Sequence, residues 1–295
     1  MIVVFGSINL DLTARVRRLP RAGETQLGFA FSVSAGGKGA NQALAARRAG
    51  SAVALHGAVG RDTFADSALA LLRQDGVDIG GVKSVDAPTG VALIHVDDDG
   101  QNTITVVPGA NGLVDATSVP LSALGPASVV LMQLETPCAE VTALAKRTRA
   151  GGGRVILNAA PAQALSPELL SLVDVLIVNE NEAAALGPSS SPLEFATMFA
   201  ARFETAVVVT LGAHGLVAAS RGAQVRLPAP TVAVVDTVGA GDALVGALAA
   251  ALDRGTPWPR ALREGLAAGS LACTRPGAQT ALPWREEITA LADTI

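Results

Sequence analysis

The sequence predicts a three-layer α/β/α fold with a mostly parallel central sheet. Short β-branched segments alternate with helical segments rich in Ala and Leu, as in IVVFG at residues 2–6 and GANQALAARRAG at residues 39–50. Hydrophobic residues make up 49% of the 295 residues and charged residues only 16%, which is typical of a buried parallel sheet covered by helices. We therefore expect one Rossmann-like domain over residues 1–295, with a substantial core.

Four later segments read as buried strands that end in polar or small residues. They are SVVLMQL, RVILNAA, DVLIVNE and AVVVTLG, and helical segments such as CAEVTALAKRTRA at residues 138–150 lie between them. Ligands of open parallel sheets bind beyond the carboxyl ends of the strands. The candidate binding residues at such ends are Asn9, Asp11, Gln133, Glu135, Asn158, Asn179, Glu182, Thr210 and Gly212.

Two segments, residues 12–34 and 88–108, interrupt this alternation with strand patterns and no helix between them. In the second, TGVALIHV and NTITVVPG flank the acidic turn DDDGQ, which predicts a hairpin. The three Asp residues of that turn could be imagined as a metal site, but turns favour Asp before Gly and no other ligand is near in the sequence. We expect the two segments to form a small β-sheet lid over the main part of the domain.

Composition favours a small-molecule partner. The formal net charge is −4 and the 22 Lys and Arg residues are spread without a run, so neither a nucleic acid nor a membrane is expected as a partner. The N-terminal segment reads as a first strand and not as a signal peptide, and no apolar run is long enough to span a bilayer. Cys138 and Cys273 are far apart and lack a CxxC companion, which favours small core residues and a reducing, cytoplasmic location.

The segment DTVGAGD (residues 236–242) places two carboxylates around a small-residue turn before the helical segment ALVGALAAAL. Backbone N–H groups at the first turn of a helix are free to bind an anion. Here they belong to Gly239, Ala240, Gly241 and Asp242. The Asp242 carboxylate could also accept a proton from an attacking hydroxyl, as phosphoryl transfer requires. An N-capping Asp before a core helix explains the same pattern.

A second glycine-rich segment, SAGGKGANQALAA (residues 34–46), also precedes a helical pattern. It is not a Walker A loop, because Gly39 follows Lys38 where Ser or Thr would stand, and it does not match a dinucleotide fingerprint. Lys38 and Asn41 lie one turn apart near the predicted helix start, where they could grip a small polyol. A plain glycine turn with a solvated Lys is the other interpretation.

Two polar turns follow later strands. In NENE (residues 179–182), Glu182 could hold a hydrated magnesium ion, but Asn179 and Glu182 also have the spacing of a capping box. TLGAHG (residues 210–215) could bind a nucleotide phosphate, or it could be a β-turn without a function.

Taken in order, the motifs resemble those of the ribokinase family of sugar and nucleoside kinases over nearly the whole chain. The resemblance is carried by GSINLD, GGKGANQA, TGVALI, PGAN, MQLE, NENE, TLGAHG, DTVGAGD, TRPGAQ and PWREE. It implies transfer of the γ-phosphate of ATP, with Mg²⁺, to the 5-hydroxyl of D-ribose, giving D-ribose 5-phosphate and ADP. It also implies a homodimer through the lid. The alternatives are a kinase for deoxyribose, another sugar or a nucleoside, and a non-catalytic sugar-binding regulator.

The resemblance assigns roles to individual residues. It implies that Asp242 is the catalytic base and that Gly239, Ala240 and Gly241 form the anion hole. The implied sugar ligands are Asn9, Asp11, Gly37, Lys38, Asn41, Glu135 and Asp242. The implied ATP contacts are Asn179, Thr210, Leu211, Gly212, Ala213, His214, Gly215 and Gly241, while Glu182 would act on magnesium through water.

A potassium site behind the glycine turn is implied as well. Its ligands would be Asp236, Val238, Ala272, Arg275, Gly277 and Ala281. Members of the family often place Ser at the position of Ala281, so one hydroxyl ligand of that site is missing here. The stretch that would face adenine, residues 266–270, lacks the polar or His residue sometimes found there.

Overall fold

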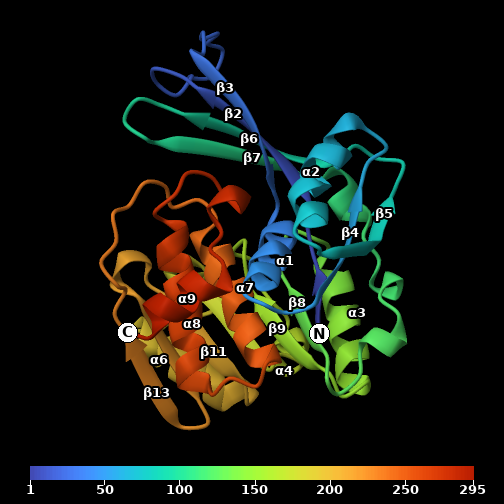
Figure 1. Cartoon of the computed structure of the whole chain (residues 1–295), viewed down its shortest axis with the longest axis vertical. Coiled ribbons are helices and arrows are strands. Elements are labelled where there is room, and N and C mark those ends of the chain that lie inside the picture. Colours follow the sequence, from blue (N-terminus) through green and yellow to red (C-terminus); the bar gives the residue numbers. More distant parts are fainter.

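The computed structural model describes all residues, 1–295, and is built around a nine-stranded sheet (Figure 1). The strand order is β13-β12-β11-β10-β9-β8-β1-β4-β5. Neighbouring strands are parallel from β11 to β5, and β12 and β13 are added antiparallel at one edge. The strands are β1 (Ile2–Phe5), β4 (Val53–Val59), β5 (Asp78–Ser84), β8 (Val129–Met132), β9 (Arg154–Asn158), β10 (Val175–Asn179), β11 (Ala206–Thr210), β12 (Leu216–Ser220) and β13 (Ala223–Leu227).

Helices cover both faces of this sheet, which confirms the predicted three layers. Along β1, Ile2 and Val4 enter one buried core, whereas Val3 and Phe5 enter the other, because successive side chains of a strand point to opposite faces. The first core lies under α1 (Lys38–Arg48), α2 (Thr63–Gln74), α7 (Ala240–Asp253), α8 (Trp258–Ala272) and α9 (Arg285–Ala292). The second lies under α3 (Cys138–Ala150), α4 (Pro167–Ser171), α5 (Glu180–Leu186) and α6 (Pro192–Phe203).

A separate four-stranded sheet extends from the main domain (Figure 1, top). Its order is β3 (Ala30–Gly36), β2 (Asn9–Arg15), β6 (Gly90–Val96) and β7 (Asn102–Val107). The predicted hairpin joins β6 to β7, and Asp97 Oδ1 accepts the backbone N–H groups of Asp99 and Gln101 in its turn. The predicted small sheet is therefore present.

Asn9 and Asp11 do not lie at the end of a main-sheet strand, contrary to the expectation. They belong to β2, because Asn9 pairs with Gly36 and Gly90 within the small sheet. The small sheet thus begins a few residues before residue 12 and carries two of the candidate sugar ligands at its base.

Close packing between α1 and α7 brings the two glycine-rich segments together. A Cβ on Gly246 of α7 would lie 2.5 Å from Ala45 Cβ and 2.7 Å from Gln42 O, so only glycine permits this approach. At its other end, α1 begins against the connection between β1 and β2, where a Cβ on Gly39 would lie 2.5 Å from Ser7 N. These contacts place the first turns of α1 and α7 side by side.

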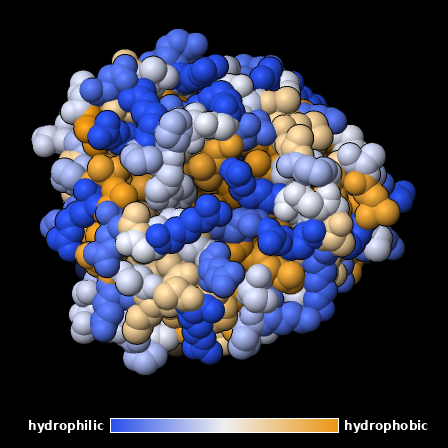
Figure 2. All heavy atoms as spheres, turned by 90° about the horizontal axis from the view of Figure 1, so that it is seen from below, coloured by the Kyte–Doolittle hydropathy of each residue, from blue (hydrophilic) through white to orange (hydrophobic).

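The surface and the cysteines bear on the composition-based predictions. At the end opposite the small sheet, polar and apolar side chains are interspersed (Figure 2). No helix has both the length and the apolar character needed to cross a membrane. Cys138 and Cys273 are free thiols, as expected, and both are only partly buried. Cys138, the first residue of α3, packs against the second core, whereas Cys273 is the C-cap of α8 and belongs to neither core, so the prediction of a core position is wrong for Cys273.

Candidate active site

Asp242 lies in the first turn of α7, where its buried carboxylate faces α1. Asn41 Nδ2 donates a hydrogen bond to Asp242 Oδ2 at 3.0 Å, and Gln42 Nε2 donates to Oδ1 at 2.8 Å. The two glycine-rich segments that were separate in the sequence therefore form one site. Asp242 does not cap α7 with its side chain; Gly239 is the N-cap.

Glu135 is held at the start of α1. Ser7 Oγ donates to Glu135 Oε2 at 2.6 Å, and the backbone N–H of Lys38 donates to the same oxygen at 3.0 Å. Gly37, just before α1, has φ 87°, and a Cβ there would lie 2.7 Å from Asn9 N. A left-handed backbone and this close approach both require glycine.

Asn9 is oriented by a residue to which the sequence assigned no role. Asn111 Nδ2 donates to Asn9 Oδ1 at 2.7 Å, and Asn111 Oδ1 accepts the N–H of Ile8 at 2.8 Å. Asn111 is fully buried. Its presence in the PGAN segment was the only available signal for this contact.

Several polar groups near Glu135 and Asp242 have no protein partner. The Asp11 carboxylate accepts no hydrogen bond in the structure, and burial together with Glu135 and Asp242 raises its pKa to about 6. The buried Asn41 Oδ1 also lacks a partner. Buried polar groups are normally paired, so this arrangement fits a ligand rich in hydroxyl groups.

Lys38 provides the positive charge of the site. Burial alone would lower the pKa of Lys38, but four surrounding carboxylates raise it above its usual value. These belong to Asp242, Glu135, Glu182 and Asp11. The ammonium group therefore stays charged among acidic groups, where it can balance a bound anion or donate to a hydroxyl.

Two adjoining cavities meet at Thr210 and Gly241, next to Asp242. The smaller, of about 140 Å³, is lined by Lys38, Asn158, Ala160, Ile177, Val178, Asn179, Glu182, Thr210, Gly239, Gly241, Asp242 and Val245. The larger, of about 500 Å³, shares Thr210 and Gly241 with it. Its remaining lining residues are Gly212, Ala213, Gly215, Ala229, Pro230, Thr231, Val232, Val234, Thr237, Ala240, Leu244, Leu266, Gly269, Ser270 and Cys273.

The structure brings most of the predicted nucleotide contacts to these cavities. Five line the larger one, and Asn179 lines the smaller one. Leu211 and His214, which belong to the same turn, line neither. Val232 and Val234 of the larger cavity's wall lie in a loop that the sequence did not single out, whereas Leu244 and Leu266 line it from α7 and α8.

The glycine turn before α7 differs in one respect from the prediction. The N–H of Ala240 is not free, because it donates to Thr237 O at 3.3 Å and closes a turn over these residues. The N–H groups of Gly239, Gly241 and Asp242 donate to no protein acceptor. A Cβ on Gly241 would meet no atom within 4 Å, so there is open space at this backbone for an anion.

Asn179 and Glu182 form the capping box that the sequence offered as one interpretation. Asn179 Oδ1 accepts the N–H of Glu182, and Glu182 Oε2 accepts the N–H of Asn179, both at 2.8 Å. Burial raises the pKa of Glu182, although the bond to Asn179 and the charge of Lys38 oppose this. Glu182 still lines the smaller cavity, so capping does not remove it from the site.

Asp236 links the glycine turn to the loop after α8. Its Oδ1 accepts the N–H of Val238 at 3.0 Å, and its Oδ2 accepts the N–H of Gly277 at 2.9 Å. The carbonyl oxygens of Val238, Arg275 and Gly277 accept no hydrogen bond. The carbonyl of Ala272 accepts a long bond of 3.4 Å from Arg275, and Ala281 is buried with only a methyl side chain.

Known proteins resemble this chain over its whole length. Residues 1–285 match the family described as pfkB family carbohydrate kinase. The chain is 35% identical over 294 residues to a ribokinase from Haemophilus influenzae, covering 97% of this chain and 96% of that protein. A ribokinase structure from Thermotoga maritima superimposes with a TM-score of 0.92 and 34% identity over 99% of each chain.

A second structure, Arabidopsis thaliana ribokinase complexed with ribose and ATP, gives a TM-score of 0.89 and 31% identity over 99% of this chain and 98% of that chain. The match in fold, sequence and length is complete enough to settle the family. The chain belongs to the pfkB family of carbohydrate kinases.

Proposed function

We propose that the protein transfers the γ-phosphate of ATP to the 5-hydroxyl of D-ribose, with Asp242 as the base. The observation that carries this proposal is the position of the Asp242 carboxylate. It lines a polar cavity beside Lys38, and the adjacent Gly241 lines both this cavity and the larger one, next to free backbone N–H groups. The similarity to a ribokinase whose structure contains ribose and ATP supports the choice of both substrates.

The sugar side of the site is dense in polar groups. The proposed ligands are Asn9, Asp11, Gly37, Lys38, Asn41 and Glu135. Asp11 and Glu135 accept hydrogen bonds from hydroxyl groups, whereas Lys38 donates to them. A nucleoside would need an apolar surface for its base, so this set favours a bare sugar such as ribose over a nucleoside. Deoxyribose or another sugar is the remaining alternative.

The nucleotide side combines apolar walls with the N-terminus of α7. Leu244 and Leu266 contribute to a cavity of about 500 Å³, which can enclose a purine and its ribose. The free N–H groups of Gly239, Gly241 and Asp242 point to the role of an anion hole for the transferred phosphoryl group. Phosphoryl transfer depends chiefly on positioning and on charge stabilisation of this kind.

The chemistry of the donor groups fits both implied cations. Glu182 uses one carboxylate oxygen in the capping box and still lines the smaller cavity, so its other oxygen is free of that box and suits a residue that binds hydrated magnesium. Magnesium supplies neutralising charge for the phosphates when it is bound. The unpaired carbonyls of Val238, Arg275 and Gly277, together with Asp236, suit a monovalent cation.

Potassium would stabilise the glycine turn from behind. Asp236 already ties this turn to the loop at Gly277, so a cation between the same loops would hold the anion hole in place. The Ala272 carbonyl would complete the site. Ala281 contributes no hydroxyl, and potassium activation is therefore the part of the proposal that an assay in sodium and potassium must decide.

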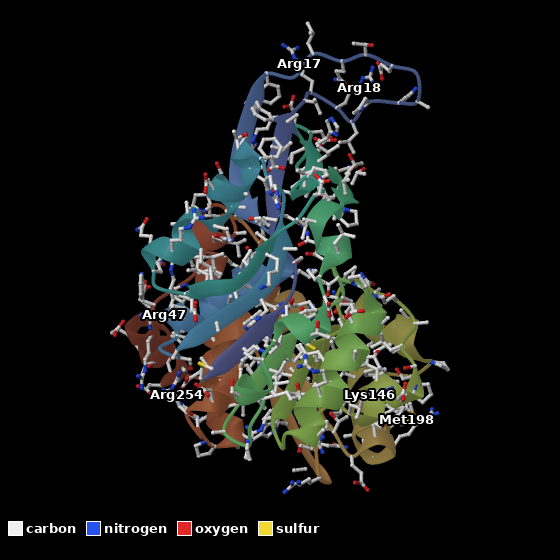
Figure 3. The ribbon with its side chains drawn as sticks, turned by 90° about the vertical axis from the view of Figure 1, so that its right-hand side faces the viewer. Arg17, Arg18, Arg47, Lys146, Met198 and Arg254 are labelled. Carbon is white, nitrogen blue, oxygen red and sulfur yellow. The ribbon has the colours of Figure 1, made fainter.

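The small sheet would act as a lid and as the surface of a homodimer. Leu12 pairs with Val33 on one side and with Leu93 on the other, so these side chains share one face with Phe31. Phe31, Val33 and Leu93 are 67%, 48% and 42% exposed. An apolar face of this kind marks an interaction site. The loop with Arg17 and Arg18 lies at the far tip of the sheet (Figure 3).

The location we propose is the cytoplasm, where the free thiols of Cys138 and Cys273 remain reduced.

A coupled ATP assay tests the proposal. Ribose, deoxyribose, other pentoses, hexoses and nucleosides are each tested with sodium or potassium as the only monovalent cation. We expect the highest kcat/KM for ribose and a higher rate in potassium. Activity confined to a nucleoside would overturn the sugar assignment, no phosphorylation of any acceptor would indicate a non-catalytic regulator, and equal rates in both salts would remove the potassium site.

A further inference from the structure

The Asp242 carboxylate is held by two neighbouring side chains that differ in their surroundings. Asn41 bonds to Oδ2 and keeps its own Oδ1 unpaired, which suits a proposed sugar ligand. Gln42 bonds to Oδ1 at 2.8 Å and is completely buried. Its amide nitrogen and its amide oxygen both have protein partners. The bond from Gln42 is therefore independent of the sugar, whereas Asn41 keeps a free oxygen with which to bind one.

The direction of the Gln42 amide is set by a chain of buried hydrogen bonds that starts at a backbone carbonyl. Ile177 O can only accept, and Asn158 Nδ2 donates to it at 3.1 Å. Asn158 Oδ1 must then face Gln42, whose Nε2 donates to it at 2.9 Å. The amide group of Gln42 carries two N–H bonds, so the same nitrogen serves both Asn158 and Asp242.

The other end of the Gln42 amide is fixed as well. Gln133 Nε2 donates to Gln42 Oε1 at 2.6 Å. Gln42 and Gln133 are completely buried, and Asn158 is 8% exposed. An amide flip of Gln42 would place its oxygen against the Asp242 carboxylate and its nitrogen against the Gln133 nitrogen, so both bonds would be lost. Only one orientation of Gln42 is compatible with its neighbours.

From this network we propose that Gln42 is a positioning residue for Asp242. It anchors Oδ1 and thereby fixes the plane of the carboxylate, so that Oδ2 faces the acceptor hydroxyl. A base must meet the proton that it accepts within hydrogen-bond distance, and catalytic groups need neighbours that lock their orientation. The proposal rests on Asp242 acting as the base.

The test compares Gln42→Met with Gln133→Met. Both variants replace a completely buried amide with an apolar side chain of similar length, but only the first removes a bond to Asp242. Rates are measured over a range of ribose concentrations, so that kcat and KM are determined separately.

For Gln42→Met we expect kcat to fall by about 10- to 100-fold, the loss typical of a misplaced catalytic group. The KM for ribose should stay within about threefold, because the contacts to ribose are untouched. Gln133→Met removes one bond that orients Gln42 but none to Asp242, so it should lower kcat clearly less than Gln42→Met does. Wild-type kinetics in Gln42→Met, or an equal fall in kcat in both variants, would overturn the positioning role.

Gln42→Met leaves the Gln133 donor buried without an acceptor, which can destabilise the fold. If that variant does not fold, the double variant Gln42→Met/Gln133→Met removes the orphaned donor as well, and the same comparison is made against Gln133→Met alone. Asp242→Asn separates this proposal from the function on which it rests. Near-normal turnover in Asp242→Asn refutes the base itself, whereas an inactive Asp242→Asn with a normal Gln42→Met refutes only the positioning role.

Discussion

We predict that the partly buried Asp11 carboxylate lowers the stability of the fold while it strengthens sugar binding. Burial, Glu135 and Asp242 raise the pKa of Asp11 from 3.8 to about 6. The folded protein therefore holds this proton more tightly than the unfolded chain does, and its stability falls as the pH rises from about 4 through 6. At about 1.4 kcal/mol for each tenfold change in proton affinity, ionised Asp11 costs the fold about 3 kcal/mol at pH 8.

The variant Asp11→Asn removes this cost, because Asn is neutral at every pH. The same pKa values put the cost at about 1.5 kcal/mol at pH 5 and about 3 kcal/mol at pH 8. The free energy of unfolding of Asp11→Asn, relative to that of the wild type, should therefore rise by about 1.5 kcal/mol between pH 5 and pH 8. Any effect of Asn that does not depend on pH cancels in this difference.

Urea unfolding of the sugar-free protein at the two pH values measures this change. Asp98→Asn, in the exposed β6–β7 turn, is the matched control and should show a change near zero. In the coupled assay, Asp11→Asn should raise the KM for ribose by about tenfold or more, since a hydrogen bond to a charged group is lost. A stability difference that is equal at both pH values, or larger at pH 5, would refute the role given to burial of Asp11.

Three further substitutions test the packing and the proposed dimer. Gly246→Ala should lower the free energy of unfolding by about 1–3 kcal/mol, because its Cβ would lie 2.5 Å from Ala45 Cβ. Arg48→Lys should lower it by about 1–3 kcal/mol, since the buried guanidinium bonds Asp75 at 2.7 Å and two backbone carbonyls. Phe31→Arg should convert the dimer to a monomer in analytical ultracentrifugation, because it places a charge on the apolar face.

Each of these substitutions has a matched control. A Cβ on Gly112 would meet no atom within 4 Å, so Gly112→Ala should change stability far less than Gly246→Ala. Arg73 forms only an exposed ion pair, and Arg73→Lys should change the free energy of unfolding by less than about 0.5 kcal/mol. Leu121 is exposed on the main domain, so Leu121→Arg should leave the dimer intact. Equal effects in a variant and its control would contradict the role that we assign to the corresponding contact.

The sequence was sufficient for the architecture because the fold repeats a local pattern. Each β-branched segment and each Ala-rich segment forms its own element, and the predicted strand ends bring Glu135, Asn179 and Thr210 to one edge of the sheet. The small sheet was also predictable, since the turn at residues 97–99 joins two alternating segments. Its extent was less clear, because Asn9 leaves the main sheet only through pairing with distant strands.

The internal contacts of the site could not be predicted in the same way. Gln42 is 91 residues from Gln133 and 116 residues from Asn158 along the chain. No local sequence pattern predicts that these side chains are in contact. The partner of the Ala240 N–H depends on how the turn closes onto Thr237. The sequence was consistent with both a capping role and a magnesium-binding role for Glu182. In the structure Glu182 closes the capping box and also lines the smaller cavity.

The rate of ATP-dependent ribose phosphorylation by Asp242→Asn is the measurement that tests the central claim most directly. The substitution keeps the size of the side chain and removes its ability to accept a proton. If Asp242 is the base, kcat should fall by about 10²- to 10⁴-fold, while the KM for ribose changes only severalfold. Turnover close to that of the wild type in a folded Asp242→Asn protein would contradict the assignment of this site.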